Sequence, residues 1–391
     1  MGIIIPIAII ILCCVIIWKA SDGFEASSDY LGRNLSDGVR GATINAIASS
    51  MPELFTTIFF LLYLKDTDGF SGGIGTTAGS AIFNGMIIPA VVILVVVLTG
   101  TTKNINVSKK VILRDGLSLI LAEFILIFSI SGDQLFWWHG LILMITYAVY
   151  IIYMFRSMSV IEADEDNEDE EEDEDEDEEE VGLIKGIFTL NLEALIVGDR
   201  SITSSRAWVL LLTSMSIIGV ACLALVSACE MLGADTYSFM GMTELKGFNI
   251  PILFVAVILA SAATSVPDTI ISMKDAKRGN YNDAISNALG SNIFDICFAL
   301  GFPLFMYTLI YGPIQMDPET IRFSTELRVI LLFLTILAFL IYFIGNKIGL
   351  TKALMLIGLY LIFTIYIISL NADLEWATSV SDFIQKLPIF D

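Results

Sequence analysis

The chain has 391 residues, of which 55% are hydrophobic and 16% are charged. A soluble domain of this length cannot bury so much apolar surface, so the composition excludes a soluble globular protein and predicts an all-α integral membrane protein. The net charge of −22 is local, because residues 162–180 hold 17 carboxylates and leave −5 for the rest of the chain. This balance excludes a nucleic-acid partner and makes the lipid bilayer the expected surroundings.

Apolar windows long enough to cross a bilayer recur along the whole chain. We expect ten of them, at 2–19, 41–64, 73–98, 111–131, 135–155, 207–232, 248–273, 283–310, 328–345 and 350–370. The first window lacks a basic start, which favours a transmembrane helix over a cleaved leader. Residues 183–197 are apolar but short and interrupted by charges, so we interpret them as an interfacial helix.

The distribution of basic residues predicts the orientation. If the ten windows alternate in direction, the loops on one side carry 16 Lys and Arg residues and the other side, termini included, carries 5. The positive-inside rule then places both termini outside and the acidic loop in the cytoplasm of a multi-pass plasma-membrane protein.

One stretch of the chain occurs twice. Residues 41–84 reappear in altered form at 256–295, with their first parts aligned at an offset of 215 and their second parts at 211. Five windows lie on each side of the acidic loop, and because five is odd, the second set enters the membrane from the opposite side. We therefore predict two inverted five-helix repeats, an architecture typical of secondary transporters.

These boundaries define the expected domains. Residues 1–156 form the first repeat, residues 157–206 form a cytoplasmic loop, and residues 207–391 form the second repeat. Within the loop, the low-complexity segment 162–180 repels itself and is expected to be disordered.

Each copy places a proline and a carboxylate inside an apolar run. Copy one reads Ala48-Ser49-Ser50-Met51-Pro52-Glu53, and copy two reads Ala263-Thr264-Ser265-Val266-Pro267-Asp268. A proline within a helix frees a backbone carbonyl, and a carboxylate in a bilayer is costly, so a matched pair of such sites indicates a function.

Helical spacing collects further oxygens next to these carboxylates. The side chains three or four residues before each carboxylate, and the pairs Ser80/Asn84 and Ser291/Asp295, share helix faces. Gly79 and Gly290 precede these serines and allow a neighbouring helix to approach closely. Such an all-oxygen cluster suits hard cations such as calcium and sodium, whereas zinc or copper would require His and Cys ligands.

The two copies resemble the alpha repeats of the cation/calcium antiporter superfamily, the sodium/calcium exchangers. The match is closest at Thr264 to Asp268 and at Gly290 to Asp295, and looser in copy one, where Thr76 and Ala81 replace the amides Asn287 and Asn292. The resemblance implies a calcium site at Glu53 and Asp268. It implies sodium ligands at Ser49, Ser50, Ser80, Asn84, Thr264, Ser265, Ser291 and Asp295.

The function that follows is electrogenic sodium/calcium antiport by alternating access, in which spans 1 and 6 slide past the other eight. Within the family, an Asp at position 295 resembles the potassium-dependent branch and also potassium-independent prokaryotic exchangers. A proton/calcium or other divalent-cation exchanger is the nearest alternative, and a calcium-buffering membrane protein acting through its acidic loop is the non-transport one. We expect no enzymatic activity and no cofactor besides the transported ions, in a monomer or loose oligomer.

Overall fold

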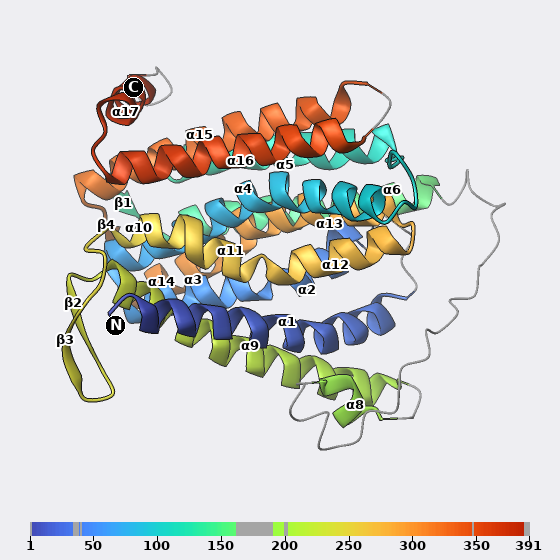
Figure 1. Ribbon diagram of the computed structural model, residues 1–391, viewed down its shortest axis with the longest axis horizontal. Coiled ribbons are helices and arrows are strands. Elements are labelled where there is room, and N and C mark those ends of the chain that lie inside the picture. Colours follow the sequence, from blue (N-terminus) through green and yellow to red (C-terminus); the bar gives the residue numbers. More distant parts are fainter. Residues whose placement is uncertain are drawn as a thin grey trace.

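The computed structural model describes residues 2–33, 39, 41–161, 191–198, 202–345 and 348–386, and these form a bundle of long helices that run roughly side by side (Figure 1). The acidic segment 162–180 lies outside the described residues. So does most of the predicted interfacial helix, of which the short helix α8 (Leu192–Ile196) is described.

The helices follow the predicted windows in chain order. The first half contains α1 (Ile4–Gly32), η1 (Gly41–Asn45), α2 (Ala46–Ser49), α3 (Met51–Tyr63), α4 (Asp66–Leu98), α5 (Lys109–Ser129) and α6 (Trp137–Ile161). The second half contains α9 (Ser204–Gly233), α10 (Ile252–Val255), η2 (Ala256–Ala260), α11 (Ser261–Thr264), α12 (Val266–Lys277), α13 (Tyr281–Phe294), η3 (Asp295–Ala299), α14 (Gly301–Tyr311), α15 (Pro318–Phe343), α16 (Leu350–Asn371) and α17 (Glu375–Gln385).

The prediction of an all-α membrane protein with several spans agrees with this structure. Among the described residues, eight helices are long and apolar enough to cross a membrane, or nine if the bent pair around Ser50 counts as one span. The remaining predicted window, 111–131, corresponds to α5, which carries Arg114, Asp115 and Glu123 and is therefore less apolar than the others.

Both copies of the repeated stretch break at equivalent serines. Ser50 separates α2 from α3 with a ψ of 10°, and Ser265 separates α11 from α12 with a ψ of 3°. Each serine stands two residues before a proline, whose ring and missing N–H prevent the helix from continuing undisturbed. In copy one the two helix pieces meet at an angle of 45°.

Two helices extend beyond the predicted windows by ten residues or more. The first window ends at residue 19, but α1 continues to Gly32. In this extension Ser21 and Ser28 donate to carbonyls of their own helix, and Asp22 and Glu25 pair with Lys274 of α12. Similarly, α15 begins ten residues before the predicted window, since the Asp317 carboxylate accepts the backbone N–H of Thr320 and caps the helix. A hydropathy profile does not detect such polar contacts, so it places the ends of these two helices too early or too late.

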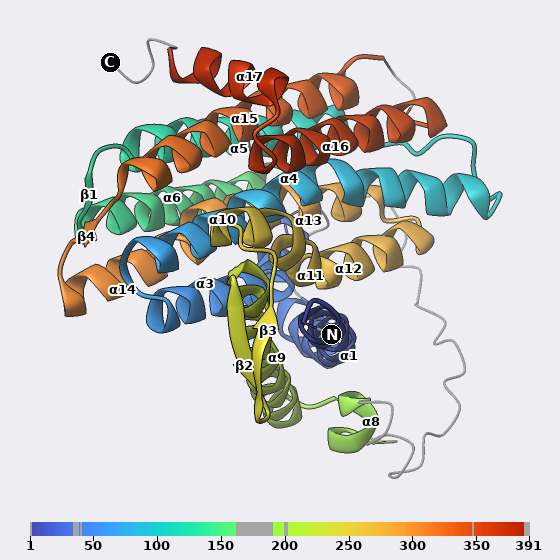
Figure 2. The same cartoon turned by 60° about the vertical axis from the view of Figure 1, so that its left-hand side comes forward.

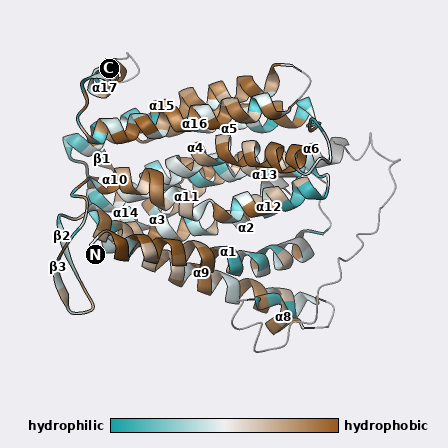
Figure 3. Ribbon diagram, viewed as in Figure 1, coloured by the Kyte–Doolittle hydropathy of each residue, from teal (hydrophilic) through white to brown (hydrophobic). Residues whose placement is uncertain are grey.

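Helix α4 occupies the centre of the bundle. It packs against α3, α12 and α13 on one side and against α15 and α16 on the other (Figure 2). Helices α1 and α9 pack mainly against each other at the edge of the bundle. Figure 3 shows that the outer helices α9 and α16 are largely hydrophobic, whereas α12 contains many hydrophilic residues.

Two glycines bring the two copies into close contact, as predicted. A Cβ on Gly79 would lie 2.4 Å from the carbonyl oxygen of Val257 in η2, and one on Gly290 would lie 2.7 Å from that of Ala42 in η1. The glycine of each copy thus packs on the backbone of the other copy, immediately beside the serine of the oxygen cluster.

Short strands link the loops at the ends of the bundle. β1 (Gln134–Leu135) pairs with β4 (Ile314–Gln315), and Ile105 pairs with Ile348. The hairpin β2 (Thr236–Phe239) and β3 (Met242–Lys246) projects from the end where the chain begins. Near β1, the buried guanidinium of Arg328 donates to the carbonyls of Ile127 and Ile130 at the end of α5.

We expect Gly79→Ala to destabilise the protein by about 1–3 kcal/mol, because the added methyl group collides with backbone rather than with a flexible side chain. The measurement is the thermal unfolding midpoint in detergent. Gly219→Ala in α9 is the matched control, since a Cβ there meets nothing within 4 Å. Equal midpoints for the two variants would show that the close packing at Gly79 is not required.

Candidate cation-binding site

The two helix breaks bring the predicted oxygen ligands into the middle of the bundle. All ten predicted site residues are at most 1% exposed. Glu53 and Asp268 stand in the first turns of α3 and α12. The helix dipole favours negative charge at these N-termini, while the C-terminal ends of α2 and α11 present carbonyl groups to the same region.

Ser80 connects the carboxylates of the two copies. Its Oγ lies 3.0 Å from Glu53 Oε1, 3.0 Å from Asp295 Oδ2 and 2.8 Å from Ser265 Oγ. The two carboxylate oxygens are therefore no more than 6.0 Å apart. A hydroxyl has one proton to donate, so Ser80 can satisfy only one of the two carboxylates at a time.

Asp268 is held by side chains from both copies. Ser291 donates to Asp268 Oδ1 at 2.5 Å, and the amide of Asn84 donates to Asp268 Oδ2 at 3.2 Å. Ser49 of copy one lies 3.3 Å from Ser291 of copy two, oxygen to oxygen. Copy one therefore completes the hydrogen bonding of the serine and the carboxylate of copy two, and the site belongs to neither copy alone.

Several oxygens in this cluster have no hydrogen-bond partner within the described part of the chain. They are Glu53 Oε2, Asp295 Oδ1, Asn84 Oδ1 and Ser50 Oγ. Buried oxygens of this kind are costly unless something donates to them or a cation coordinates them. The donor set, made of carboxylates, hydroxyls and an amide, therefore fits a hard cation such as calcium or sodium.

The carboxylates do not form a compact metal centre by themselves. Across the residues that the structure describes, no three His, Cys, Asp or Glu side chains are close enough together to hold a metal ion. A cation at this site would depend on hydroxyl, amide and backbone oxygens as well. Thr264 lies near Glu53, and Ser50 lies near Asp295, which places both among the oxygens available for that purpose.

Asn287, which is not among the ten predicted ligands, also joins the cluster. Its amide donates to Ser272 Oγ at 3.0 Å and approaches the backbone carbonyl of Asp268 at 3.5 Å, while Ser49 approaches its carbonyl oxygen at 3.4 Å. The signal for it was its position four residues before Ser291, on the same helix face. Asn292 likewise crosses between copies by donating to the carbonyl of Ala81 at 2.9 Å.

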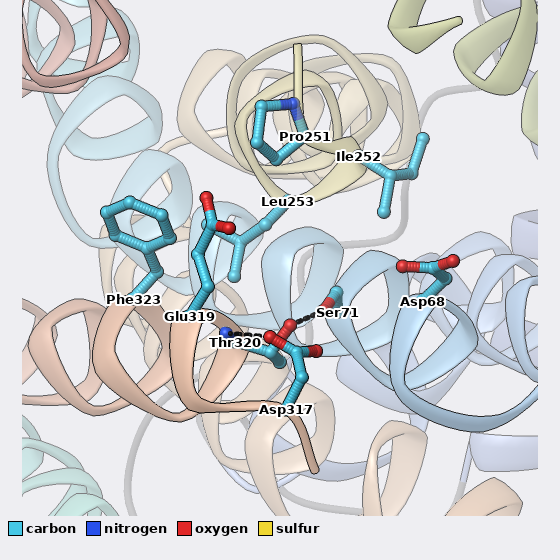
Figure 4. A pocket seen from close by; sticks show the side chains of 9 residues that line it. All are labelled: Asp68, Ser71, Pro251, Ile252, Leu253, Asp317, Glu319, Thr320 and Phe323. Carbon is cyan, nitrogen blue, oxygen red and sulfur yellow. Dashed lines mark hydrogen bonds between the residues drawn. The ribbon is translucent and has the colours of Figure 1, made fainter. Parts of the chain in front are cut away.

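An acidic depression of about 270 Å³ lies beside the start of α10, at the end of the bundle where the chain begins (Figure 1), and Figure 4 shows its lining side chains. It is lined by residues of α4 and by residues at the starts of α10 and α15, including the carboxylates of Asp68, Asp317 and Glu319. Partial burial acts to raise the pKa of Asp317, but hydrogen bonds from Thr320 and Thr67 outweigh it and hold that pKa below its ordinary value. Asp317 is therefore ionised at neutral pH.

The chain is similar in sequence to two proteins over most of its length and to a third over a shorter stretch. The chain is 25% identical over 431 residues to human sodium/potassium/calcium exchanger 5, an alignment that covers 93% of this chain and 84% of that protein. It is 25% identical over 364 residues to an uncharacterized membrane protein of Methanocaldococcus jannaschii, covering 92% and 97% of the two chains. A shorter stretch is 36% identical over 121 residues to rat sodium/potassium/calcium exchanger 3, covering 31% of this chain and 18% of that protein.

Solved structures share the fold at lower identity. The crystal structure of the H⁺/Ca²⁺ exchanger CAX matches with a TM-score of 0.60 and 16% identity, over 98% of this chain and 85% of that one. The sodium-calcium exchanger NCX_Mj matches with a TM-score of 0.56 and 20% identity, over 92% and 97% of the two chains.

The family assignment itself comes from the sequence profile of the sodium/calcium exchanger proteins, which matches residues 5–156 and 206–369. These ranges include both copies of the repeated stretch and leave out the acidic segment. The chain therefore belongs to the sodium/calcium exchanger protein family, whose members are membrane exchangers rather than enzymes.

Proposed function

We propose that this protein is a sodium/calcium antiporter that moves the two ions across a membrane by alternating access. The observation that carries the proposal is the buried oxygen cluster shared by the two copies, in which Ser80 touches Glu53 of its own copy and Asp295 of the other. A site built at the interface of two repeats can be exposed to either side when the repeats rearrange around it.

The proposed topology has ten transmembrane helices in two inverted five-helix repeats, residues 1–156 and 207–391, joined by the cytoplasmic loop 157–206. The pairing of short strands supports a topology in which successive loops lie on opposite sides of the membrane. β1 and β4 join the loops after the fourth and eighth windows, and the Ile105 and Ile348 bridge joins those after the third and ninth. Both termini would then lie outside a plasma membrane, in a monomer or loose oligomer.

In this proposal calcium binds between Glu53 and Asp268, and the remaining eight predicted ligands, from Ser49 to Asp295, supply the sodium sites. Glu53, Asp268 and Asp295 together carry three negative charges when ionised, in a medium where uncompensated charge is very costly. Three sodium ions balance them. One calcium ion leaves one negative charge. If the calcium-loaded site crosses the membrane in that state, each exchange of three sodium ions for one calcium ion transfers one net positive charge, whereas a proton on Asp295 that crossed with calcium would make the exchange electroneutral.

Two other coupling ions have specific support. The structural match to an H⁺/Ca²⁺ exchanger favours protons as the first alternative, because carboxylates bind protons as well as sodium. Asp295, together with the similarity to sodium/potassium/calcium exchanger 5, favours potassium cotransport as the second. The non-transport alternative, calcium buffering by the acidic loop, concerns residues 162–180, which lie outside the described part of the chain.

The proposed moving unit is the pair α1 and α9, and an ion bridge ties it to the site-bearing helices. Lys274 in α12 lies 2.7 Å from Glu25 and 3.1 Å from Asp22 of α1, nitrogen to oxygen. Lys274 follows Asp268 by six residues, or about 9 Å of helix, towards the proposed cytoplasmic end. Phe59 occupies the equivalent position of copy one and carries no charge, so it cannot form the corresponding ion bridge. The two ends of the proposed ion pathway therefore differ in this contact.

We expect Glu53→Gln and Asp268→Asn each to reduce calcium uptake into proteoliposomes to the background level, because a neutral amide removes the charge that compensates calcium. Glu375→Gln, on the exposed face of α17, should transport normally. Uptake that survives loss of Glu53 would contradict the antiporter and favour calcium buffering elsewhere in the chain.

Sodium-loaded proteoliposomes diluted into sodium-free buffer should take up calcium, and an inside-positive potential should accelerate uptake. The proposed cycle removes one positive charge from the vesicle, which is worth about 2.3 kcal/mol per 100 mV. Uptake driven by a pH gradient but not by sodium would overturn sodium coupling. Equal uptake with and without potassium would exclude potassium cotransport. Insensitivity to the potential would overturn the electrogenic cycle and indicate that a proton crosses with calcium.

Lys274→Glu should shift the balance between outward-facing and inward-facing states, since it breaks the bridge between α1 and α12. The bridge is more than a third exposed and therefore screened by solvent, so we expect a change of about two- to fivefold in the apparent sodium affinity from the cytoplasmic side. The control is the charge swap Lys274→Glu with Glu25→Lys, which should restore the affinity. Failure of the swap to restore it would show that the bridge does not set this balance.

A further inference from the structure

The helix α17 carries three distinct stripes of side chains. Ala377, Ser381 and Ile384 are buried against the bundle. Trp376, Val380 and Phe383, spaced at four and three residues, form an apolar stripe beside it and are 47%, 41% and 67% exposed. The remaining face is polar, with Glu375, Ser379 and Asp382 exposed. This pattern matches a helix that contacts protein, lipid and water on three sides.

Specific polar contacts fix α17 against α15 and α16. Ser381 donates to Glu326 at 2.5 Å, and Arg322 donates to Asp382 at 2.9 Å and to Ser381 at 3.0 Å. The ring of Trp376 meets that of Tyr366 edge to face, with 5.9 Å between the ring centres. The orientation of the apolar stripe is therefore set by the packing of the helix.

These contacts place α17 at the level of a membrane surface. Arg322 and Glu326 follow the start of α15 by four and eight residues, and Tyr366 precedes the end of α16 by five, so the contacts lie about 6–12 Å inside the ends of two spanning helices. Amphipathic interfacial helices bury their apolar face to about 5–10 Å in the boundary between headgroups and acyl chains. In Figure 1, α17 is seen nearly end-on and crosses the direction of the bundle.

Further exposed apolar side chains lie on α16, which contacts α17, and on the residues just before α17. Ile365 and Ile368 on α16 are 56% and 57% exposed, and Leu374, just before α17, is 47% exposed. Trp137 and Trp138 begin α6 at the same end of the bundle, next to β1 and its partner β4, and are also partly exposed. Exposed tryptophans at one level of a bundle are typical of the membrane interface.

We propose that α17 is a membrane-surface helix whose stripe of Trp376, Val380 and Phe383 inserts into the lipid leaflet at the end of the bundle where the chain begins. The partner is the apolar boundary of the leaflet rather than charged headgroups, because the helix bears Glu375 and Asp382 and Arg322 already pairs with Asp382. Insertion therefore does not require anionic lipid. It anchors α15 and α16, which flank α4 and its Ser80.

The test uses the full-length protein in vesicles, with a bimane label at an introduced cysteine. Phe383→Cys and Val380→Cys report on the stripe, Ser379→Cys on the polar face, and Ile365→Cys is the reference for lipid contact. Labelled protein without an introduced cysteine provides the background from the five native cysteines. Quenching is measured with brominated phosphatidylcholine and with aqueous iodide, and calcium uptake shows that each variant is folded.

We expect brominated lipid to quench the stripe labels about as strongly as the Ile365 label and at least about twofold more than the Ser379 label, with the opposite order for iodide. Vesicles of pure phosphatidylcholine and vesicles containing phosphatidylglycerol should give the same result. Iodide quenching of position 383 equal to that of position 379 would overturn the proposal. If position 383 is shielded from both quenchers, and the shielding increases with the protein-to-lipid ratio, the stripe contacts a second copy of the chain instead. Lipid quenching that occurs only with phosphatidylglycerol would contradict apolar insertion.

Discussion

The structure depends on accommodating three carboxylates inside an apolar bundle. Glu53, Asp268 and Asp295 are fully buried, and the free-energy cost of burying them falls only if each is surrounded by donors or by cations. The protein supplies fewer hydrogen-bond donors than the carboxylates can accept, since Ser80 offers one proton to two of them. Among the described residues, carboxylate oxygens are therefore left without hydrogen-bond donors, and such oxygens can coordinate cations. A cluster in which every oxygen already accepted a hydrogen bond would be less suited to bind a cation.

Breaking the helices is the physical means by which such a site is built. An unbroken helix directs its carbonyls along its own axis, whereas the breaks at Ser50 and Ser265 create helix ends within the bundle. Their dipoles favour carboxylates on the N-terminal pieces and cations near the C-terminal pieces. The glycines at 79 and 290 then allow the backbones to approach, so that one copy's serine reaches the other copy's carboxylate.

The two ends of the bundle are not equivalent, even though the copies are related in sequence. At one end lie the acidic depression, the paired loops β1 and β4, and the helix α17 against α15. At the other, Lys274 ties α1 to α12 through two carboxylates. In the proposed exchanger, identical inverted repeats would have symmetric end states, and these differences between the two ends would favour one state over the other.

The sequence by itself determined the membrane class, most helices, the repetition of the motif and the identity of its carboxylates, because these depend on composition and on spacing within one helix. Only the tertiary structure decided that Ser80 bridges Glu53 to Asp295, that Asn84 reaches Asp268 and that Asn287 joins the cluster. It also decided that α1 runs on to Gly32 and that α17 packs on α15. Helical periodicity states which side chains share a face, but which faces meet between segments far apart in the chain depends on packing, and a single sequence does not encode packing in any local pattern.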